Sequence, residues 1–155
     1  MTVYEGRLTG VGGRYALVAS RFNELVVNSL VAGAQNALVR HGVEDGQVDL
    51  VWVPGAMEIP VVCQRAAKTG RYDAVIALGA VIRGSTPHFD VVVNAVNSGC
   101  ARISLETGVP VIFGVLTTDT IEQAIERAGT KAGNQGRNAA VAAVEMVSVL
   151  RALED

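Results

Sequence analysis

Short apolar runs alternate along this chain with longer segments whose apolar residues recur at helical spacing. The runs are continuous rather than interleaved with polar residues, which is typical of strands buried on both faces of a parallel sheet. Asn23 and Thr117–Asp119 are expected to cap the first and fourth of the helices that follow the runs. The runs cover residues 14–20, 49–53, 73–78 and 111–116. Helices are predicted after Asn23 up to Gly42, up to about Thr69, from about His88 to Gly108, over 120–128, and from about 135 to 153.

The repeated order of strand and helix predicts an α/β fold in which helices cover both faces of a four-stranded parallel sheet. The expected fold class is a three-layer, flavodoxin-like sandwich. Residues 1–155 would form a single domain, with its core in residues 14–155. Within the glycine-rich residues 1–13, Thr2–Arg7 could form a strand, but only by pairing with another sheet, such as that of a neighbouring subunit.

Composition adds expectations about the surface and the partners. Half of the 155 residues are hydrophobic, 18% are charged and the mean hydropathy is +0.34, so we expect subunit contacts to cover much apolar surface. The net charge of −2 gives no electrostatic reason to expect nucleic acid as a partner. No apolar run approaches a membrane span and no signal peptide is visible, which predicts a cytoplasmic protein with no membrane partner. Cys63 and Cys100 fall in apolar helical segments, where we expect buried thiols rather than a disulfide or a metal pair.

The strongest candidate chemistry follows the third apolar run, in residues 78–90. Thr86 could cap a helix whose first turn contains Pro87, and the free N–H groups of such a helix end favour an anion, typically a phosphate. No lysine follows the second glycine of this segment, so it is not a Walker loop for a nucleoside triphosphate. His88 stands beside the expected anion site, and an imidazole can move protons near neutral pH. The alternative is a tight turn with an incidental exposed histidine.

Residues after the other strands add to this site. Phe22 could be a hydrophobic staple on the following helix or an aromatic ring that contacts a ligand. Glu58 could serve the dipole of its helix or bind a heterocycle. We expect Phe22, Ala56, residues 80–88 and Phe113 to lie at one edge of the sheet. Since ligands of α/β proteins bind outside the carboxyl ends of the strands, the sequence predicts one ligand site there.

Five motifs lie along these segments in order: Arg21-Phe22-Asn23, Pro54-Gly55-Ala56-x-Glu58-x-Pro60, Gly79-Ala80-Val81-Ile82-Arg83-Gly84-x-Thr86-x-His88-Phe89, Gly114-Val115-Leu116-Thr117-Thr118 and Glu122-Gln123-Ala124-x-x-Arg127-Ala128-Gly129. With these motifs, the chain from Ser20 to Leu150 resembles the lumazine synthase family, which forms 6,7-dimethyl-8-ribityllumazine in riboflavin biosynthesis.

This resemblance implies a transferase that condenses 5-amino-6-(D-ribitylamino)uracil with 3,4-dihydroxy-2-butanone 4-phosphate. His88 would shuttle protons during the condensation. Phe22 would stack on the pyrimidine ring, and Phe113 of a neighbouring subunit would line the same pocket. The family needs no metal and no organic cofactor, so none is expected here.

The remaining site residues are implied in three groups. The ribityl chain would be bound by Ala56, Met57 and Glu58. The edge of the pyrimidine would meet backbone groups of Ala80, Val81 and Ile82. The phosphate would be bound by Ser85, Thr86 and, from the neighbouring subunit, Arg127.

Two positions depart from the family's pattern. Gln135 and Asn138 stand where the family commonly has a lysine and an acidic residue, which puts rate and affinity in question rather than the type of reaction. The family forms homo-oligomers built from pentamers, and the short Gly129–Asn134 turn resembles that of members whose twelve pentamers form an icosahedral shell. Riboflavin synthase would be a further partner.

Two other functions compete with the enzyme. A non-catalytic shell protein of the same fold would bind flavin or lumazine after losing its chemistry through the two departures, but Phe22, His88 and Arg127 argue against it. A flavodoxin-like electron carrier would need a phosphate loop rich in glycine and hydroxyl residues after the first strand, where this chain has Ser20–Asn23.

Overall fold

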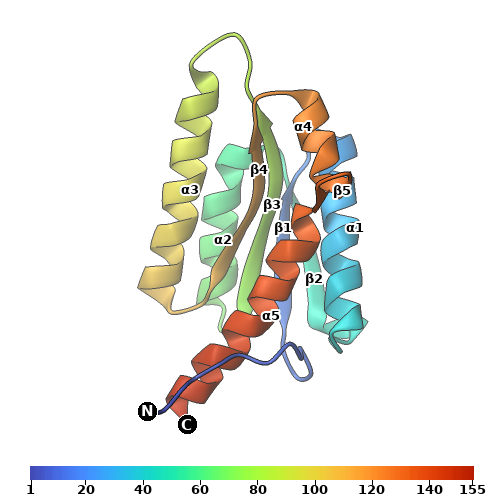
Figure 1. Cartoon of the computed structure of the whole chain (residues 1–155). Coiled ribbons are helices and arrows are strands. Elements are labelled where there is room, and N and C mark those ends of the chain that lie inside the picture. The colour runs from blue at the N-terminus through green and yellow to red at the C-terminus, as the bar shows by residue number, and fades with distance from the viewer.

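A four-stranded, all-parallel sheet forms the middle layer of the computed structural model, which describes residues 1–155 (Figure 1). The strands lie in the order β2-β1-β3-β4, and the four-stranded parallel sheet is confirmed. Their bounds are Tyr15–Ser20 for β1, Val48–Val53 for β2, Ala74–Ile82 for β3 and Val111–Thr118 for β4.

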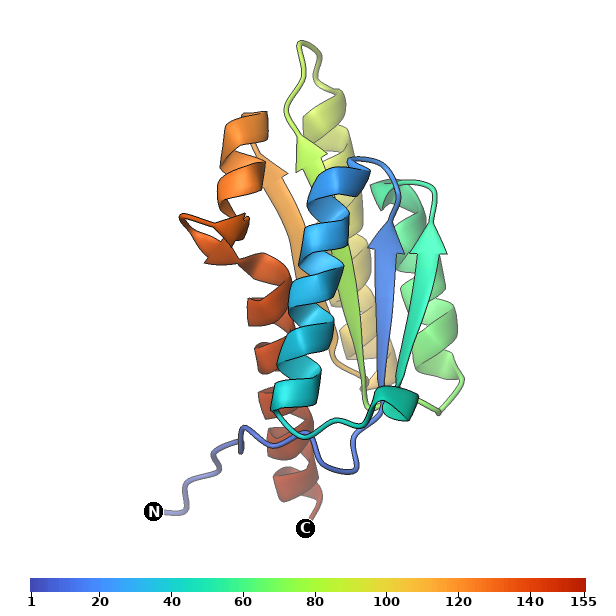
Figure 2. The same cartoon turned by 90° about the vertical axis from the view of Figure 1, so that its right-hand side faces the viewer.

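Helices cover both faces of this sheet, as Figures 1 and 2 show. The first and last helices pack on one face around a core that includes Leu17, Leu30 and Val144; the second and third pack on the other face around Val18, Val96 and Ile103. The three-layer, flavodoxin-like sandwich is therefore confirmed. The helices are α1 Glu24–Arg40, α2 Ile59–Lys68, α3 His88–Thr107, α4 Ile121–Glu126 and α5 Gln135–Glu154. Shorter elements are the 3-10 turns η1 Asp45–Gln47 and η2 Ala56–Glu58 and the hairpin strands β5 Ala128–Thr130 and β6 Gly133–Asn134.

Two strands run further than the apolar runs predict. Gly79–Ile82, expected as a loop, continue β3 and pair with Val115–Thr118 of β4. The pairing also explains why Thr117–Asp119 do not cap α4, because Thr117 and Thr118 belong to the sheet. Instead, Thr120 caps α4 in a reciprocal capping box with Gln123.

Of the other two expected helix caps, Thr86 is wrong, whereas Asn23 holds the expected position but makes no capping bond. Pro87, not Thr86, precedes the first residue of α3, and no side chain bonds to the N–H groups of its first turn. Asn23 does precede α1, but its backbone is left-handed and its side chain makes no capping hydrogen bond. Its amide is engaged elsewhere, as described below.

Residues 1–13 form no strand within the chain and run across the C-terminal part of α5 (Figure 2). The Arg7 N–H donates to Ser148 Oγ at 2.9 Å, and the Gly10 N–H donates to the His41 carbonyl at 2.7 Å. The strand expected over Thr2–Arg7 requires a second sheet, so its pairing with a neighbouring subunit stays a prediction.

Both cysteines are free and buried, as expected. Cys63 of α2 and Cys100 of α3 share one core cluster, and the hydrogen bond to Cys100 together with burial raises the pKa of the Cys63 thiol. None of the helices is both long enough and apolar enough to cross a membrane.

Candidate active site

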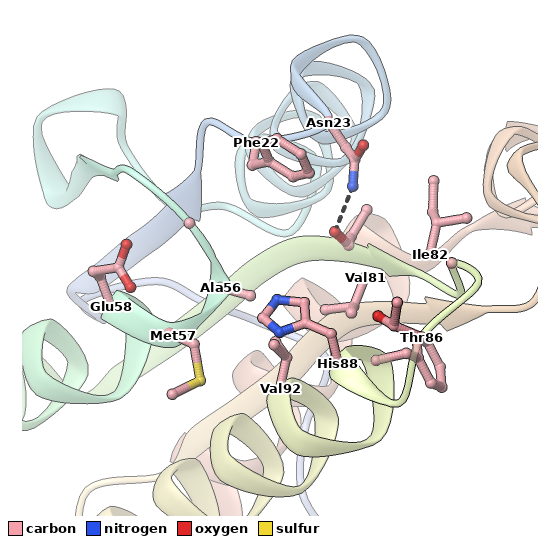
Figure 3. Close-up of a pocket in the computed structure, with 14 residues that line it drawn as sticks. Phe22, Asn23, Ala56, Met57, Glu58, Val81, Ile82, Thr86, His88 and Val92 are labelled. Carbon is pink, nitrogen blue, oxygen red and sulfur yellow. Dashed lines mark hydrogen bonds between the residues drawn. The ribbon is translucent and has the colours of Figure 1, made fainter.

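A cavity of about 410 Å³ opens at the carboxyl ends of β1, β2 and β3, beside the start of α3 (Figure 3). This volume falls in the range of small-molecule sites. Nine of the expected site residues line it: Phe22, Ala56, Met57, Glu58, Ala80, Val81, Ile82, Thr86 and His88. The sequence therefore located the cavity. Five further residues also line the cavity: Asn23, Gly55, Gly84, Phe89 and Val92.

Three expected residues lie outside the cavity in this chain. Ser85 is exposed in the loop after β3. Phe113 is the third residue of β4 and pairs with Ala77, so it lies toward the amino end of its strand, and its expected place at the carboxyl edge is wrong. Arg127 ends α4, whose Ala124 packs into the core under α1 and α5, whereas η2 and α3 line the cavity.

Phe22 presents a ring that is largely free of protein contacts. The residue is 73% exposed, which does not fit a staple buried against α1. The turn that carries it is fixed by two backbone hydrogen bonds to the end of β2: the Arg21 N–H donates to the Val53 carbonyl at 2.8 Å, and the Phe22 N–H to the Pro54 carbonyl at 3.1 Å. The ring thus stands at the mouth of the cavity, where it can stack on a flat ligand (Figure 3).

His88 is the first residue of α3, and its imidazole points into the cavity toward Ala56 and Val81 (Figure 3). It has no hydrogen-bond partner within the chain. The Asp90 N–H is the first in this helix end to be bonded, at 3.2 Å to the Pro87 carbonyl. With no side-chain cap on α3, the free N–H groups at its start make an anion site next to the imidazole.

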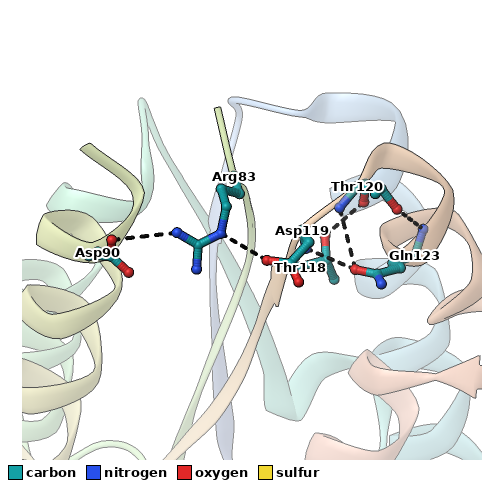
Figure 4. Close-up of polar contacts among 6 residues, drawn as sticks. All are labelled: Arg83, Asp90, Thr118, Asp119, Thr120 and Gln123. Carbon is teal, nitrogen blue, oxygen red and sulfur yellow. Dashed lines mark hydrogen bonds and ion pairs between the residues drawn. The ribbon is translucent and has the colours of Figure 1, made fainter. Parts of the chain in front are cut away.

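Arg83, at the start of the loop between β3 and α3, is held by two carboxylates (Figure 4). Its Nε donates to Asp119 at 2.8 Å, its Nη1 lies 3.5 Å from Asp90, and its guanidinium carbon lies 4.3 Å from the centre of the Phe89 ring. The hydrogen bond that Arg83 donates to the Asp119 carboxylate raises the pKa of Arg83. The cation nearest to the anion site in the sequence is therefore neutralised by its own neighbours.

The carboxyl end of β3 has one open backbone edge. β1 last pairs with β3 through Ala19 and Leu78, so residues of β3 beyond Leu78 have no strand on the β1 side. The Arg83 N–H donates to the Thr118 carbonyl at 2.8 Å, on the β4 side. Since backbone groups alternate sides along a strand, those of Ala80 and Ile82 face the cavity side, while those of Val81 face β4.

No group of three or more His, Cys, Asp or Glu side chains in the chain could hold a metal ion. The chemistry available in the cavity is a proton-transfer group, a carboxylate, an exposed aromatic ring and an anion-binding helix end. This set suits a phosphorylated substrate together with a flat, hydroxylated one.

A family comparison bears on the same residues. The model of the 6,7-dimethyl-8-ribityllumazine synthase family, a transferase family, matches residues 12–151 and so includes every strand exit that forms the cavity. The match confirms the resemblance drawn from the motifs. The chain belongs to the 6,7-dimethyl-8-ribityllumazine synthase family.

Proposed function

We propose that this protein is a lumazine synthase that condenses 5-amino-6-(D-ribitylamino)uracil with 3,4-dihydroxy-2-butanone 4-phosphate, releasing phosphate and water. The observation that carries the proposal is the convergence of Phe22, Glu58 and His88 on one cavity beside the uncapped start of α3. The family match supports it independently.

The pyrimidine substrate would occupy the half of the cavity between Phe22 and β3. Phe22 would stack on its ring, and the open backbone groups of Ile82 would bond to its edge, beside the Ala80 carbonyl that already accepts a hydrogen bond from Asn23. Val81 would contribute its side chain, because its backbone faces β4. Ala56 and Met57 would line the path of the ribityl chain, and Glu58 would accept hydrogen bonds from its hydroxyl groups.

The phosphate substrate would bind at the start of α3. The free N–H groups there, with the hydroxyls of Ser85 and Thr86, favour a phosphate. Arg83 is paired with Asp90 and Asp119 and offers no spare charge. The missing positive charge would come from Arg127 of a neighbouring copy, whose guanidinium has a rigid fork suited to phosphate.

The reaction needs proton transfers and close approach more than strong activation. The amine of the uracil adds to the ketone and water leaves; phosphate is then eliminated, and the second amine closes the ring with loss of a second water. His88 would donate and accept protons in these steps. Because both reactants are held in one cavity, proximity would supply much of the acceleration.

The assembly expected for this function is a pentamer, with twelve pentamers forming a shell, in the cytoplasm. A site shared between copies supports it, since Arg127 and Phe113 lie outside the cavity of their own chain. Phe113 is half-buried on β4, a strand at the edge of the sheet, where a neighbouring subunit can reach it. Residues 1–155 would act as one domain, and riboflavin synthase would use the product.

The decisive experiment mixes the purified protein with both substrates and follows lumazine fluorescence above the uncatalysed background. Faster formation of lumazine supports the proposal. If the rate equals the background while riboflavin or lumazine still binds, the non-catalytic shell protein is the better description. The observation that favours this second candidate is Gln135, which stands where the family commonly has a lysine. The Gln135 N–H donates to the Arg127 carbonyl at 2.8 Å, so the change lies beside the arginine proposed to bind phosphate.

A further inference from the structure

We propose that Asn23 is a positioning residue that fixes the open edge of β3 against Phe22 and so sets the width of the pyrimidine slot. This inference rests on the proposed function, because the slot is defined by its ligand. Asn23 itself lines the cavity, and its amide is directed away from α1, the helix it precedes (Figure 3).

The backbone conformation of Asn23 is not the one that a residue at the start of a helix usually adopts. It has φ 65° and ψ 45°, and no other residue except glycine has a positive φ in this chain. An asparagine before a helix normally has an extended backbone and accepts an N–H bond from the first turn. Asn23 does neither. Such left-handed residues persist where surrounding contacts hold them, and they gather at ligand sites.

The contact that holds Asn23 crosses the cavity edge to β3. Its Nδ2 donates to the Ala80 carbonyl at 2.8 Å, between residues 57 positions apart in the sequence (Figure 3). Since β1 no longer pairs with β3 at this point, the amide takes the place of the absent strand at Ala80. The corresponding backbone groups of Ile82 are left for a ligand.

The same turn is also tied to β2. Arg21 and Phe22 donate their N–H groups to the Val53 and Pro54 carbonyls, so residues 21–23 bridge the ends of β2 and β3. The Phe22 ring and the β3 edge are therefore held at a fixed separation, and Asn23 provides the bond on the β3 side. Without that bond the pyrimidine should bind less tightly, whereas the phosphate site at α3 should be unaffected.

Asn23→Gly tests this role, because glycine adopts the left-handed backbone without strain and removes only the side chain. We expect KM for the pyrimidine to rise about tenfold, because the net contribution of one hydrogen bond corresponds to about a tenfold change in affinity. KM for the butanone phosphate should change less than about twofold. Asn23→Asp keeps the shape but cannot donate, and we expect it to be at least as impaired because its carboxylate would face the Ala80 carbonyl.

Asn36→Gly is the matched control. Asn36 is exposed on α1, far along the helix from the cavity, so this variant weakens the fold without touching the slot. An inactive wild-type protein would refute the proposed function. If the wild-type protein is active, three results would each refute the inference about Asn23. These are an unchanged pyrimidine KM in Asn23→Gly, an equal rise of both KM values in Asn23→Gly, and the same rise of the pyrimidine KM in Asn36→Gly.

Discussion

At the scale of single residues, the proposed proton-transfer group, His88, lies on a different element from the residues proposed to hold the reactants. The imidazole of His88 is exposed to the cavity and makes no bond within the chain, so its removal leaves the walls intact. Phe22 and Glu58 stand on other strand exits and do not depend on it. Chemistry and binding can therefore be altered independently at this site.

His88→Ala should lower kcat on the order of 10²-fold and leave the rate above the uncatalysed background. General acid–base help is lost, but the cavity still brings both substrates together. Steady-state kinetics with purified protein measure the effect, and a thermal melt checks that the fold is unchanged. A complete loss of activity in a folded variant would contradict this account, because it would make His88 indispensable to the chemistry.

At the scale of elements, the loop between β3 and α3 is fastened to β4 by Arg83. Its contacts with Asp119 and Asp90 join the end of β4 to the first turn of α3. Arg83→Gln would leave two carboxylates unpaired near the anion site, and like charge repels a phosphate. We expect KM for the butanone phosphate to rise several-fold, with a smaller change for the pyrimidine.

Arg102→Gln is the control for Arg83→Gln. Arg102 pairs with Glu106 at 3.3 Å, one turn along the exposed side of α3, and this pair does not line the cavity. Its kinetics should match those of the wild type. Adding Asp119→Asn to Arg83→Gln removes one of the unpaired carboxylates and should restore part of the phosphate affinity. Failure of that restoration would show that Arg83 acts by contact rather than charge.

The contact between α5 and α1 depends on a missing side chain. A Cβ on Gly136 would overlap the backbone carbonyl of Leu30, so Gly136→Ala must push the two helices apart. We expect the free energy of unfolding to fall by about 1–3 kcal/mol. In Gly46→Ala the new methyl group meets nothing within 4 Å, so the stability should stay within about 1 kcal/mol of the wild type. Urea denaturation compares the two; equal stabilities would contradict the close packing.

Sequence patterns predicted the elements well and their ends less well. The core of each strand and the helix stop at Gly108 follow from local signals: continuous apolar runs, and a glycine that takes φ 72° where other residues are strained. The last part of β3 was missed because Gly79–Ile82 become a strand only by pairing with β4, over 30 residues away. That pairing depends on the sheet and leaves no local mark.

Local sequence signals also predicted the place of the candidate site, but not every contact within it. Phe22, Glu58 and His88 lie in the segments that follow three of the apolar runs, so the parallel topology brings them to one edge. The role of Asn23 was not predictable, because its sequence position suits an ordinary helix cap and its true partner, the Ala80 carbonyl, belongs to a distant strand. The expected place of Phe113 is wrong because the strand that contains it, β4, continues for five residues beyond it.

At the scale of the whole molecule, we expect a neighbouring copy of the chain to complete the site. The cavity has no lysine or arginine among its lining residues, while the Arg127 side chain is 45% exposed and contacts only the Gln123 carbonyl and the Glu126 carboxylate. Several apolar side chains on α2 and α3 are also exposed in the single chain, including Val61, Val91 and Leu105. Both facts fit an assembly in which each copy completes the site of the next.

Intersubunit complementation tests that arrangement. His88→Ala impairs the cavity of its own chain, and Arg127→Ala impairs the cavity of a neighbour, so each variant alone has only damaged sites. When both variants are co-expressed, about a quarter of the interfaces in randomly mixed assemblies should pair an intact His88 with an intact Arg127. We therefore expect lumazine synthesis per subunit to exceed that of either variant and to approach about a quarter of the wild-type rate.

The control for complementation co-expresses Arg127→Ala with a double variant that carries both His88→Ala and Arg127→Ala. This mixture has no intact Arg127, so it should recover nothing beyond the activity of its parts. Recovery by the single variants but not by the control requires that His88 and Arg127 of different copies act on the same substrate. If the single variants also fail to recover while size-exclusion chromatography shows that they assemble together, then Arg127 does not act across the interface, and the phosphate's countercharge must come from the same chain.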